Sequence, residues 1–194
     1  MKAMPEKGPV RRLFSLLTSG RGFASFDLGV LKVGLMLAAV DGRVVEREIA
    51  IFKRIARKCP GWSAEATEEI LEDGLHAAGY LLIQSHRLNE RQLIAAFVRE
   101  AHKALPFGFA SSGIHDLRRA FIMWGLMVGA DLKASMVEAK AVLALRDACK
   151  LKDRIPDSFL REIERQFLRL GEEATCLEAL KMFKTFIDVG DADS

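Results

Sequence analysis

The chain has 194 residues, of which 50% are hydrophobic and 28% are charged, and its formal net charge is +3 at pH 7. A domain of this length buries roughly 70% of its unfolded surface, so it needs neither disulfides nor a structural metal to hold a core. The three cysteines, Cys59, Cys149 and Cys176, form no C-x-x-C pair, which excludes a zinc ribbon and a dithiol redox motif.

The sequence favours an intracellular location. Unpaired cysteines are typical of a reducing compartment. No apolar run reaches the ~20 residues that a membrane-spanning helix requires. The first apolar patch, residues 13–17, is too short for the core of a signal peptide. We therefore expect a cytoplasmic protein.

Positive charge is concentrated at the N-terminus. Residues 1–25 carry a net charge of +4, so residues 26–194 carry −1. We expect residues 1–25 to form a flexible basic arm that can contact an anionic membrane surface or nucleic acid, although a solvated tail is the simpler interpretation. The near-neutral charge of residues 26–194 argues against a nucleic-acid-binding groove.

Composition predicts an all-α fold, because Ala, Leu, Glu, Lys and Arg dominate and signals for β-hairpins are nearly absent. We expect the first helix to begin with Asp27 as its N-cap and to reach about residue 40. The second should cover residues 45–58 and end before Pro60. Ser63 is a suitable N-cap for the third helix, which should extend past residue 80.

Further helices follow at clear start signals. Residues 89–92, "NERQ", resemble a capping box and predict a fourth helix that ends before Pro106. The linker "ALPFGFASSG" precedes a fifth helix over residues 112–130. The remaining helices should begin near Ser135, Pro156 and Thr175, which gives about eight in total.

The two halves of the chain resemble each other. A shift of 90 residues places Asp41 on Asp131, Glu48 on Glu138 and Cys59 on Cys149. The order of helix, acidic turn, helix and break is also shared. This pattern predicts one domain over residues 26–190, built from two pseudo-repeated αα-hairpin halves that share one core. The halves should cover about residues 26–104 and 112–190.

Residues 37–52, "LAAVDGRVVEREIAIF", place three carboxylates between two helices: Asp41, Glu46 and Glu48. An EF-hand loop with Glu48 at its last position would need ligands at Leu37 and Ala39, which have no side-chain oxygen, so an EF-hand is excluded. Capping is the simpler interpretation. Glu138 can form a capping box with Ser135, and Glu48 occupies the equivalent position of its own helix.

The stretch "AAVDGRVVEREIAIF" resembles the signature of the TerB-like family, whose members were first linked to tellurite resistance, and the motif returns in weaker form after 90 residues. The resemblance implies an all-α fold of two related halves, without established enzymatic chemistry. It also implies a stress-response role or a co-chaperone role. By position, the residues that would gather a divalent metal ion are Asp41, Glu46, Glu48, Asp131 and Glu138.

This sequence departs from the family pattern at three positions. Val45 stands where a small polar cap is usual, Leu132 replaces the glycine of the second copy, and Met136 stands opposite Glu46. Two complete acidic clusters are therefore not available. A single site would require the two turns to meet in space.

We expect a non-enzymatic domain, because no nucleophile triad, P-loop or dinucleotide fingerprint is present. Two functions remain open. In the first, the chain is a stress-response domain that binds a divalent metal ion at the acidic turn. In the second, it is a protein–protein interaction module of the co-chaperone type, in which the same acidic residues serve only as helix caps. The sequence indicates no oligomeric state.

Overall fold

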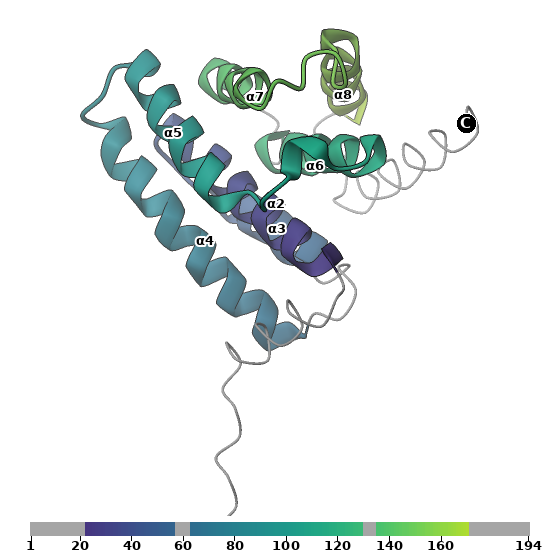
Figure 1. Cartoon of the computed structure of the whole chain (residues 1–194). Coiled ribbons are helices and arrows are strands. Elements are labelled where there is room, and N and C mark those ends of the chain that lie inside the picture. Colours follow the sequence, from purple (N-terminus) through teal and green to yellow (C-terminus); the bar gives the residue numbers. More distant parts are fainter. Residues whose placement is uncertain (1–21, 57–62, 130–134, 171–194) are drawn as a thin grey trace, which may run out of the picture.

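The computed structural model describes residues 22–56, 63–129 and 135–170. These residues form helices and no strand, so the all-α prediction is confirmed for this part of the chain (Figure 1). The α-helices are α2 (Gly22–Ala38), α3 (Glu46–Ala56), α4 (Ala64–Ser85), α5 (Glu90–Ala104), α6 (Ile114–Val128), α7 (Met136–Ala148) and α8 (Asp157–Leu170). Two short 3-10 helices, η1 (Ala39–Asp41) and η2 (Phe109–Ser111), complete the set.

The described ranges thus hold seven α-helices, and the prediction of about eight is not confirmed. The helix that we expected from Thr175 lies outside the described residues, as does most of the basic arm. None of the helices in the described ranges is both long enough and apolar enough to cross a membrane.

Three predicted helix starts are confirmed by their side-chain caps. The Ser63 hydroxyl accepts a hydrogen bond from the Ala66 amide at 3.2 Å. Asn89 and Gln92 form a reciprocal capping box, with N···O distances of 3.0 and 3.2 Å. Ser135 caps α7 in the same way. Each cap satisfies backbone amides that the first helical turn leaves without a partner.

The predicted cap at Asp27 is wrong. Helix α2 begins at Gly22, so Asp27 lies inside the helix, where it is only 3% exposed. Its carboxylate instead forms an ion pair with Arg119 of α6, which is 92 residues later in the chain. A buried charge needs such a partner, and this distant contact overrides the local preference of Asp for a helix start.

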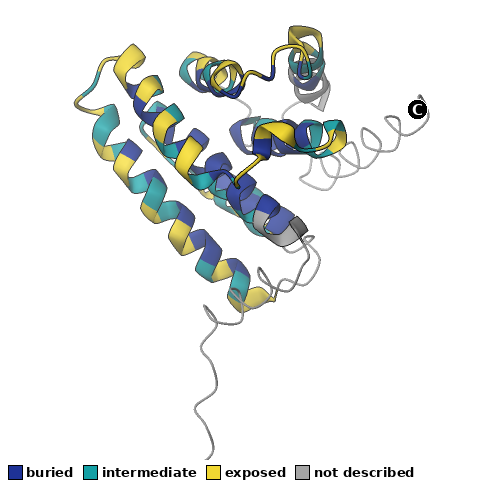
Figure 2. Cartoon of the chain, viewed as in Figure 1, coloured by how far each residue is buried: buried dark blue, intermediate teal, exposed yellow. Residues whose placement is uncertain are grey.

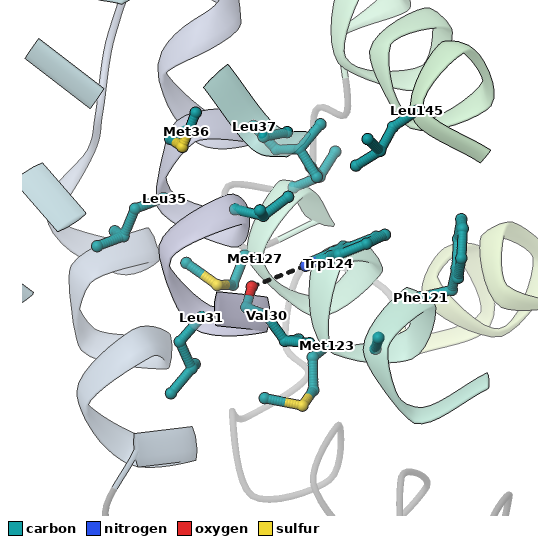
Figure 3. Close-up of a cluster of buried hydrophobic side chains, with 14 of the residues drawn as sticks. Val30, Leu31, Leu35, Met36, Leu37, Phe121, Met123, Trp124, Met127 and Leu145 are labelled. Atoms are coloured by element: carbon teal, nitrogen blue, oxygen red, sulfur yellow. Dashed lines mark hydrogen bonds between the residues drawn. The ribbon is translucent and has the colours of Figure 1, made fainter. Parts of the chain in front are cut away.

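Helix α2 is the centre of the molecule and contacts α3, α4, α5, α6 and α7. It is apolar on almost every side, which is typical of a fully buried helix. Trp124 of α6, itself completely buried, donates its indole N–H to the Val30 carbonyl of α2 at 2.8 Å (Figure 3). Figure 2 shows buried residues on the inner faces of the surrounding helices and exposed residues on their outer faces.

Helices α2 and α4 run parallel to each other. The Lys32 ammonium of α2 lies 2.6 Å from the Asp73 carboxylate of α4, and Gly74 packs against Leu35. At the other end, Gly42 lies against Ser85. In these three contacts, each residue of α2 and its turn lies beside a residue about 40 positions later in the chain. By the same offset, Gly22 at the start of α2 is level with the start of α4.

Candidate functional site

The acidic turn "VDGRVVERE" connects η1 to α3. Asp41 ends η1, and Gly42 follows with φ 93°, a left-handed conformation that suits glycine. Asp41 accepts two hydrogen bonds from Arg43: one from the backbone amide at 3.1 Å and one from the side-chain Nε at 3.0 Å. The side chain of Asp41 is 14% exposed and that of Arg43 is 55% exposed. Asp41 therefore shapes the turn and holds the Arg43 side chain.

Glu48 caps its own helix. One carboxylate oxygen accepts a hydrogen bond from the Val45 amide at 2.7 Å, and the Glu48 amide donates to the Val45 carbonyl at 3.1 Å. The residue is 4% exposed. Glu46, in the same first turn, is exposed and faces solvent. The first helical turn of α3 therefore carries one buried and one exposed carboxylate, and both lie where the helix dipole favours negative charge.

Glu138 has the same arrangement in α7. Its carboxylate accepts from the Ser135 amide at 2.6 Å, and its own amide donates to the Ser135 hydroxyl at 3.2 Å. Glu138 is 2% exposed. The predicted capping box at Ser135 is thus confirmed. Val45 has no side-chain oxygen, so in α3 only the glutamate half of that box is formed.

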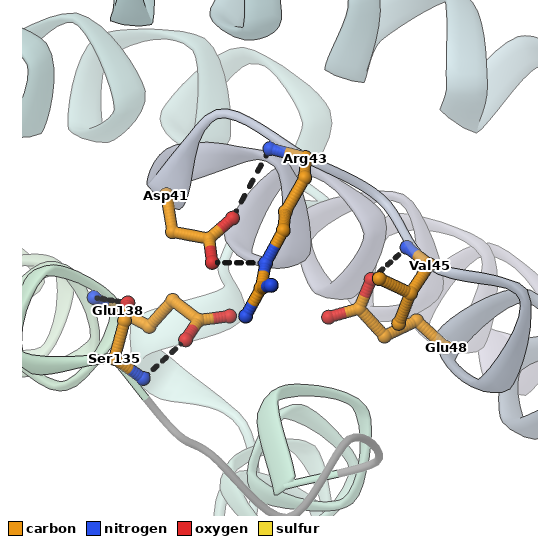
Figure 4. Close-up of polar contacts among 6 residues, drawn as sticks. All are labelled: Asp41, Arg43, Val45, Glu48, Ser135 and Glu138. Carbon is orange, nitrogen blue, oxygen red and sulfur yellow. Dashed lines mark hydrogen bonds and ion pairs between the residues drawn. The ribbon is translucent and has the colours of Figure 1, made fainter.

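The two turns lie close together, because η1 packs against α7. Figure 4 shows the Arg43 side chain extending from the Asp41 turn, with its guanidinium between the carboxylates of Glu48 and Glu138. Two buried carboxylates would be costly without positive charge nearby. The Arg43 guanidinium, which forms an ion pair with Asp41, provides positive charge in the same region.

The five residues predicted as metal ligands thus separate into three groups. Asp41, Glu48 and Glu138 lie in one region around Arg43, whereas Glu46 is exposed at the start of α3. Asp131 falls outside the described residues. Within the ranges that the structure describes, no three His, Cys, Asp or Glu side chains are grouped as a metal ion would require.

Sequence reasoning missed Arg43. The signal was present, because Arg43 stands two positions after Asp41 and five before Glu48 in "DGRVVERE". Its role depends on Glu138, 95 positions later, which the fold brings beside the turn.

Cys149 and four histidines are the remaining side chains of the described residues that catalysis or metal binding commonly uses. Burial raises the pKa of the Cys149 thiol, which disfavours the nucleophilic thiolate. All four histidines are exposed, at positions 76, 86, 102 and 115.

Comparison of the chain with protein-family models, with curated proteins and with solved structures gave no significant match.

Proposed function

We propose that this chain is a non-enzymatic, TerB-like interaction domain of the co-chaperone adaptor type, built from two pseudo-repeated halves. In it the acidic turns stabilise the fold, and a partner protein binds the outer surface. The observation that carries the proposal is the use of Glu48 and Glu138 as helix caps. Both bond to backbone amides, with Arg43 as their nearby cation. The burial of both carboxylates is then accounted for without a bound ion.

The outer face of α7 is the surface that we assign to the partner. Met136 is 70% exposed and Leu143 is 39% exposed, and their spacing of seven residues places them on one side of the helix. Lys140, which lies between them on that side, forms an ion pair with Glu90 of α5 at 2.6 Å. Exposed apolar side chains with a polar border are typical of a protein-binding surface.

The proposal is tested by affinity purification with the full chain as bait and quantitative mass spectrometry of the captured proteins. A specific partner should be enriched by the wild-type chain and depleted at least about tenfold by the Met136→Asp/Leu143→Asp variant. The matched control is Tyr80→Asp/Ile83→Asp, which changes two exposed residues of α4. If every captured protein is retained equally by both variants, the α7 surface is not the binding site.

A second function, binding of a divalent metal ion in a stress response, is favoured by one observation: Asp41, Glu48 and Glu138 come from two turns and still lie in one region. Isothermal titration of the metal-stripped chain with calcium, magnesium, manganese and zinc tests it. Saturable binding that Asp41→Asn/Glu48→Gln abolishes, with helical content unchanged, would support the metal site and contradict a purely structural turn. Absence of binding would contradict the metal site.

A further inference from the structure

The outer side of α4 presents one exposed row of side chains, which we call the α4 stripe. It consists of positions 65, 69, 72, 76, 80, 83 and 87, whose spacing of three or four residues places them on one side of the helix. Arg87 belongs to the turn that directly follows α4, where its amide donates to the Gln84 carbonyl at 2.9 Å. Six of the seven positions are exposed and Glu69 is half-buried, whereas the buried residues of α4 lie on the opposite side. The stripe is thus an outer surface of the described fold.

Charge is separated along the α4 stripe. Glu65, Glu69 and Glu72 lie in its first half, and Arg87 lies at its other end. Like charges three or four residues apart on a helix repel each other, so the three glutamates destabilise the helix when nothing is bound to it. A cation beside this acidic half would reduce that repulsion.

Two lysines near the acidic half are already paired at its edges. Lys32 of α2 forms an ion pair with Asp73 at 2.6 Å, and Lys53 of α3 forms one with Glu68 at 2.8 Å. Among the described residues, no ion pair includes any of the three stripe glutamates. These carboxylates are therefore available to cations of a second molecule.

Helix α5 adds positive charge beside the basic end of the stripe. It runs antiparallel to α4 (Figure 1), and the Arg99 guanidinium of α5 donates to the Tyr80 hydroxyl oxygen at 3.2 Å. Since that oxygen accepts the bond, the Tyr80 O–H remains available as a donor. Arg91, exposed at the start of α5, lies beside the end of α4. One surface of the α4–α5 hairpin therefore has an acidic end and a basic end.

The spacing of the α4 stripe makes it complementary to an antiparallel copy of itself. Positions 65, 69 and 72 lie 11, 7 and 4 residues before His76, and positions 87, 83 and 80 lie the same distances after it. When two copies meet about a two-fold axis beside His76, Glu65 of one copy faces Arg87 of the other. Tyr80 then faces Glu72 of the other copy and can donate its O–H to that carboxylate. An isologous interface requires this kind of self-complementarity.

We propose that the chain forms a two-fold symmetric dimer through the α4 stripe, with the acidic half of each copy against the basic end of the other. Each contact between unlike charges occurs twice, and the repulsion among the glutamates is reduced. The contact also covers Tyr80, which is 40% exposed, and Ile83, which is 55% exposed. Because α5 lies between α4 and α7 (Figure 1), the dimer does not use Met136 or Leu143, and each copy keeps its α7 surface.

The size of the surface predicts a weak dimer. At 1.5 Å per residue, the 22 residues of α4 extend about 33 Å, and two helices side by side are about 20 Å wide. A contact over α4 and α5 thus covers roughly 600 Å² per copy, which is less than the ~800 Å² per partner of a standard interface. We expect dissociation in the micromolar range, and weaker association at high salt because the paired charges lie near solvent.

Sedimentation velocity of the full chain, over a range of micromolar concentrations, tests the dimer. The wild-type chain should shift from monomer to dimer as its concentration rises. Glu65→Arg and Arg87→Glu should each weaken this self-association at least about tenfold, because like charges then face each other. A mixture of the two variants should form a mixed dimer, since both contacts between positions 65 and 87 then join opposite charges.

The matched control is Arg161→Glu, which reverses the charge of an exposed arginine on α8 and should leave self-association unchanged. Circular dichroism checks that all three variants are folded. A wild-type chain that stays monomeric at every concentration would overturn the proposal and leave the stripe to a different protein. Equal weakening by Arg161→Glu, or a mixture that associates no better than the single variants, would also contradict it, because positions 65 and 87 would then not meet across the interface.

Discussion

Arg43 gives the acidic turn a positive charge of its own. It bonds to Asp41 within the turn, and its guanidinium lies between Glu48, from the same turn, and Glu138, from the start of α7. The Arg43 side chain thus lies near two carboxylates, Asp41 and Glu138, that are 97 positions apart in the sequence. Replacement of this residue tests the two interpretations of the acidic motif, because it leaves three carboxylates in one region without that cation.

Replacement of Arg43 by Gln should lower the free energy of unfolding by about 1–2 kcal/mol, since hydrogen bonds to charged groups are lost. For a chain of this size, that corresponds to a fall in Tm of roughly 2–8 °C. Thermal unfolding followed by circular dichroism measures it. Arg47→Gln, which changes an exposed arginine four residues away, is the matched control and should shift Tm by less than about 2 °C.

Divalent cations should change the Tm of the Arg43→Gln variant more than that of the wild-type chain. In Arg43→Gln, calcium or magnesium at millimolar concentration should raise Tm, because a cation can replace the guanidinium between the carboxylates. The wild-type chain, in which Arg43 is present, should show little change under the same conditions. A larger rise in the wild-type chain than in the variant would contradict the structural role of Arg43 and favour a native metal site.

Glycines show how closely the helices pack. A Cβ at Gly29 of α2 would lie 2.6 Å from the Ala104 carbonyl oxygen and 2.8 Å from the Pro106 ring, whereas a Cβ at Gly79 of α4 would meet nothing within 4 Å. Both glycines have ordinary helical conformations. The same substitution should therefore have opposite effects at the two positions.

Gly29→Ala should destabilise the fold by about 1–3 kcal/mol, because the backbone carbonyl that the new methyl group would meet cannot move away alone. Gly79→Ala should instead stabilise it by about 0.5–1 kcal/mol, since alanine loses less backbone entropy in a helix. Urea unfolding of both variants gives the two values. Equal effects at the two positions would show that helix propensity, rather than the approach of α2 to α5, controls stability here.

At the scale of the helix, local sequence signals predicted the starts well. Ser63, Asn89 and Ser135 each bond to the amide three positions later, so their role depends on neighbours that the sequence shows directly. Asp27 failed because its partner, Arg119, comes from another helix. Arg43 was missed for the same reason: the approach of η1 to α7 is a tertiary contact that no local pattern contains.

Among the described helices, buried charged side chains form ion pairs that connect one helix to another. The Asp27–Arg119 pair connects α2 to α6, and the Arg146–Asp157 pair connects the consecutive helices α7 and α8. Arg146, near the end of α7, is 3% exposed and bonds to Asp157 at the start of α8 and to the Ile155 carbonyl. The Arg146 guanidinium lowers the pKa of Asp157 below its ordinary value. This ion pair connects the end of α7 to the start of α8.

The Asp157–Arg146 pair should make stability depend on pH. Because the folded state lowers the pKa of Asp157, the stabilisation is complete above the unfolded-state pKa and is lost as the pH falls through the folded-state pKa. Asp157→Asn should therefore lower Tm at pH 7, and the difference from the wild-type chain should shrink as the solution is acidified below the ordinary value of 3.8. Thermal unfolding at several pH values measures it. A difference in Tm that does not change with pH would show that the pair contributes through packing alone.

The central position of α2 also has a consequence for synthesis on the ribosome. Helix α2 comes first in the described part of the chain, yet Val30 meets Trp124 only after 94 further residues have been made. At typical rates of elongation, that interval is roughly 5–20 s. During it, the most apolar of the described helices has emerged while Trp124 is still to be translated, so the nascent chain exposes an apolar segment of the kind that chaperones bind.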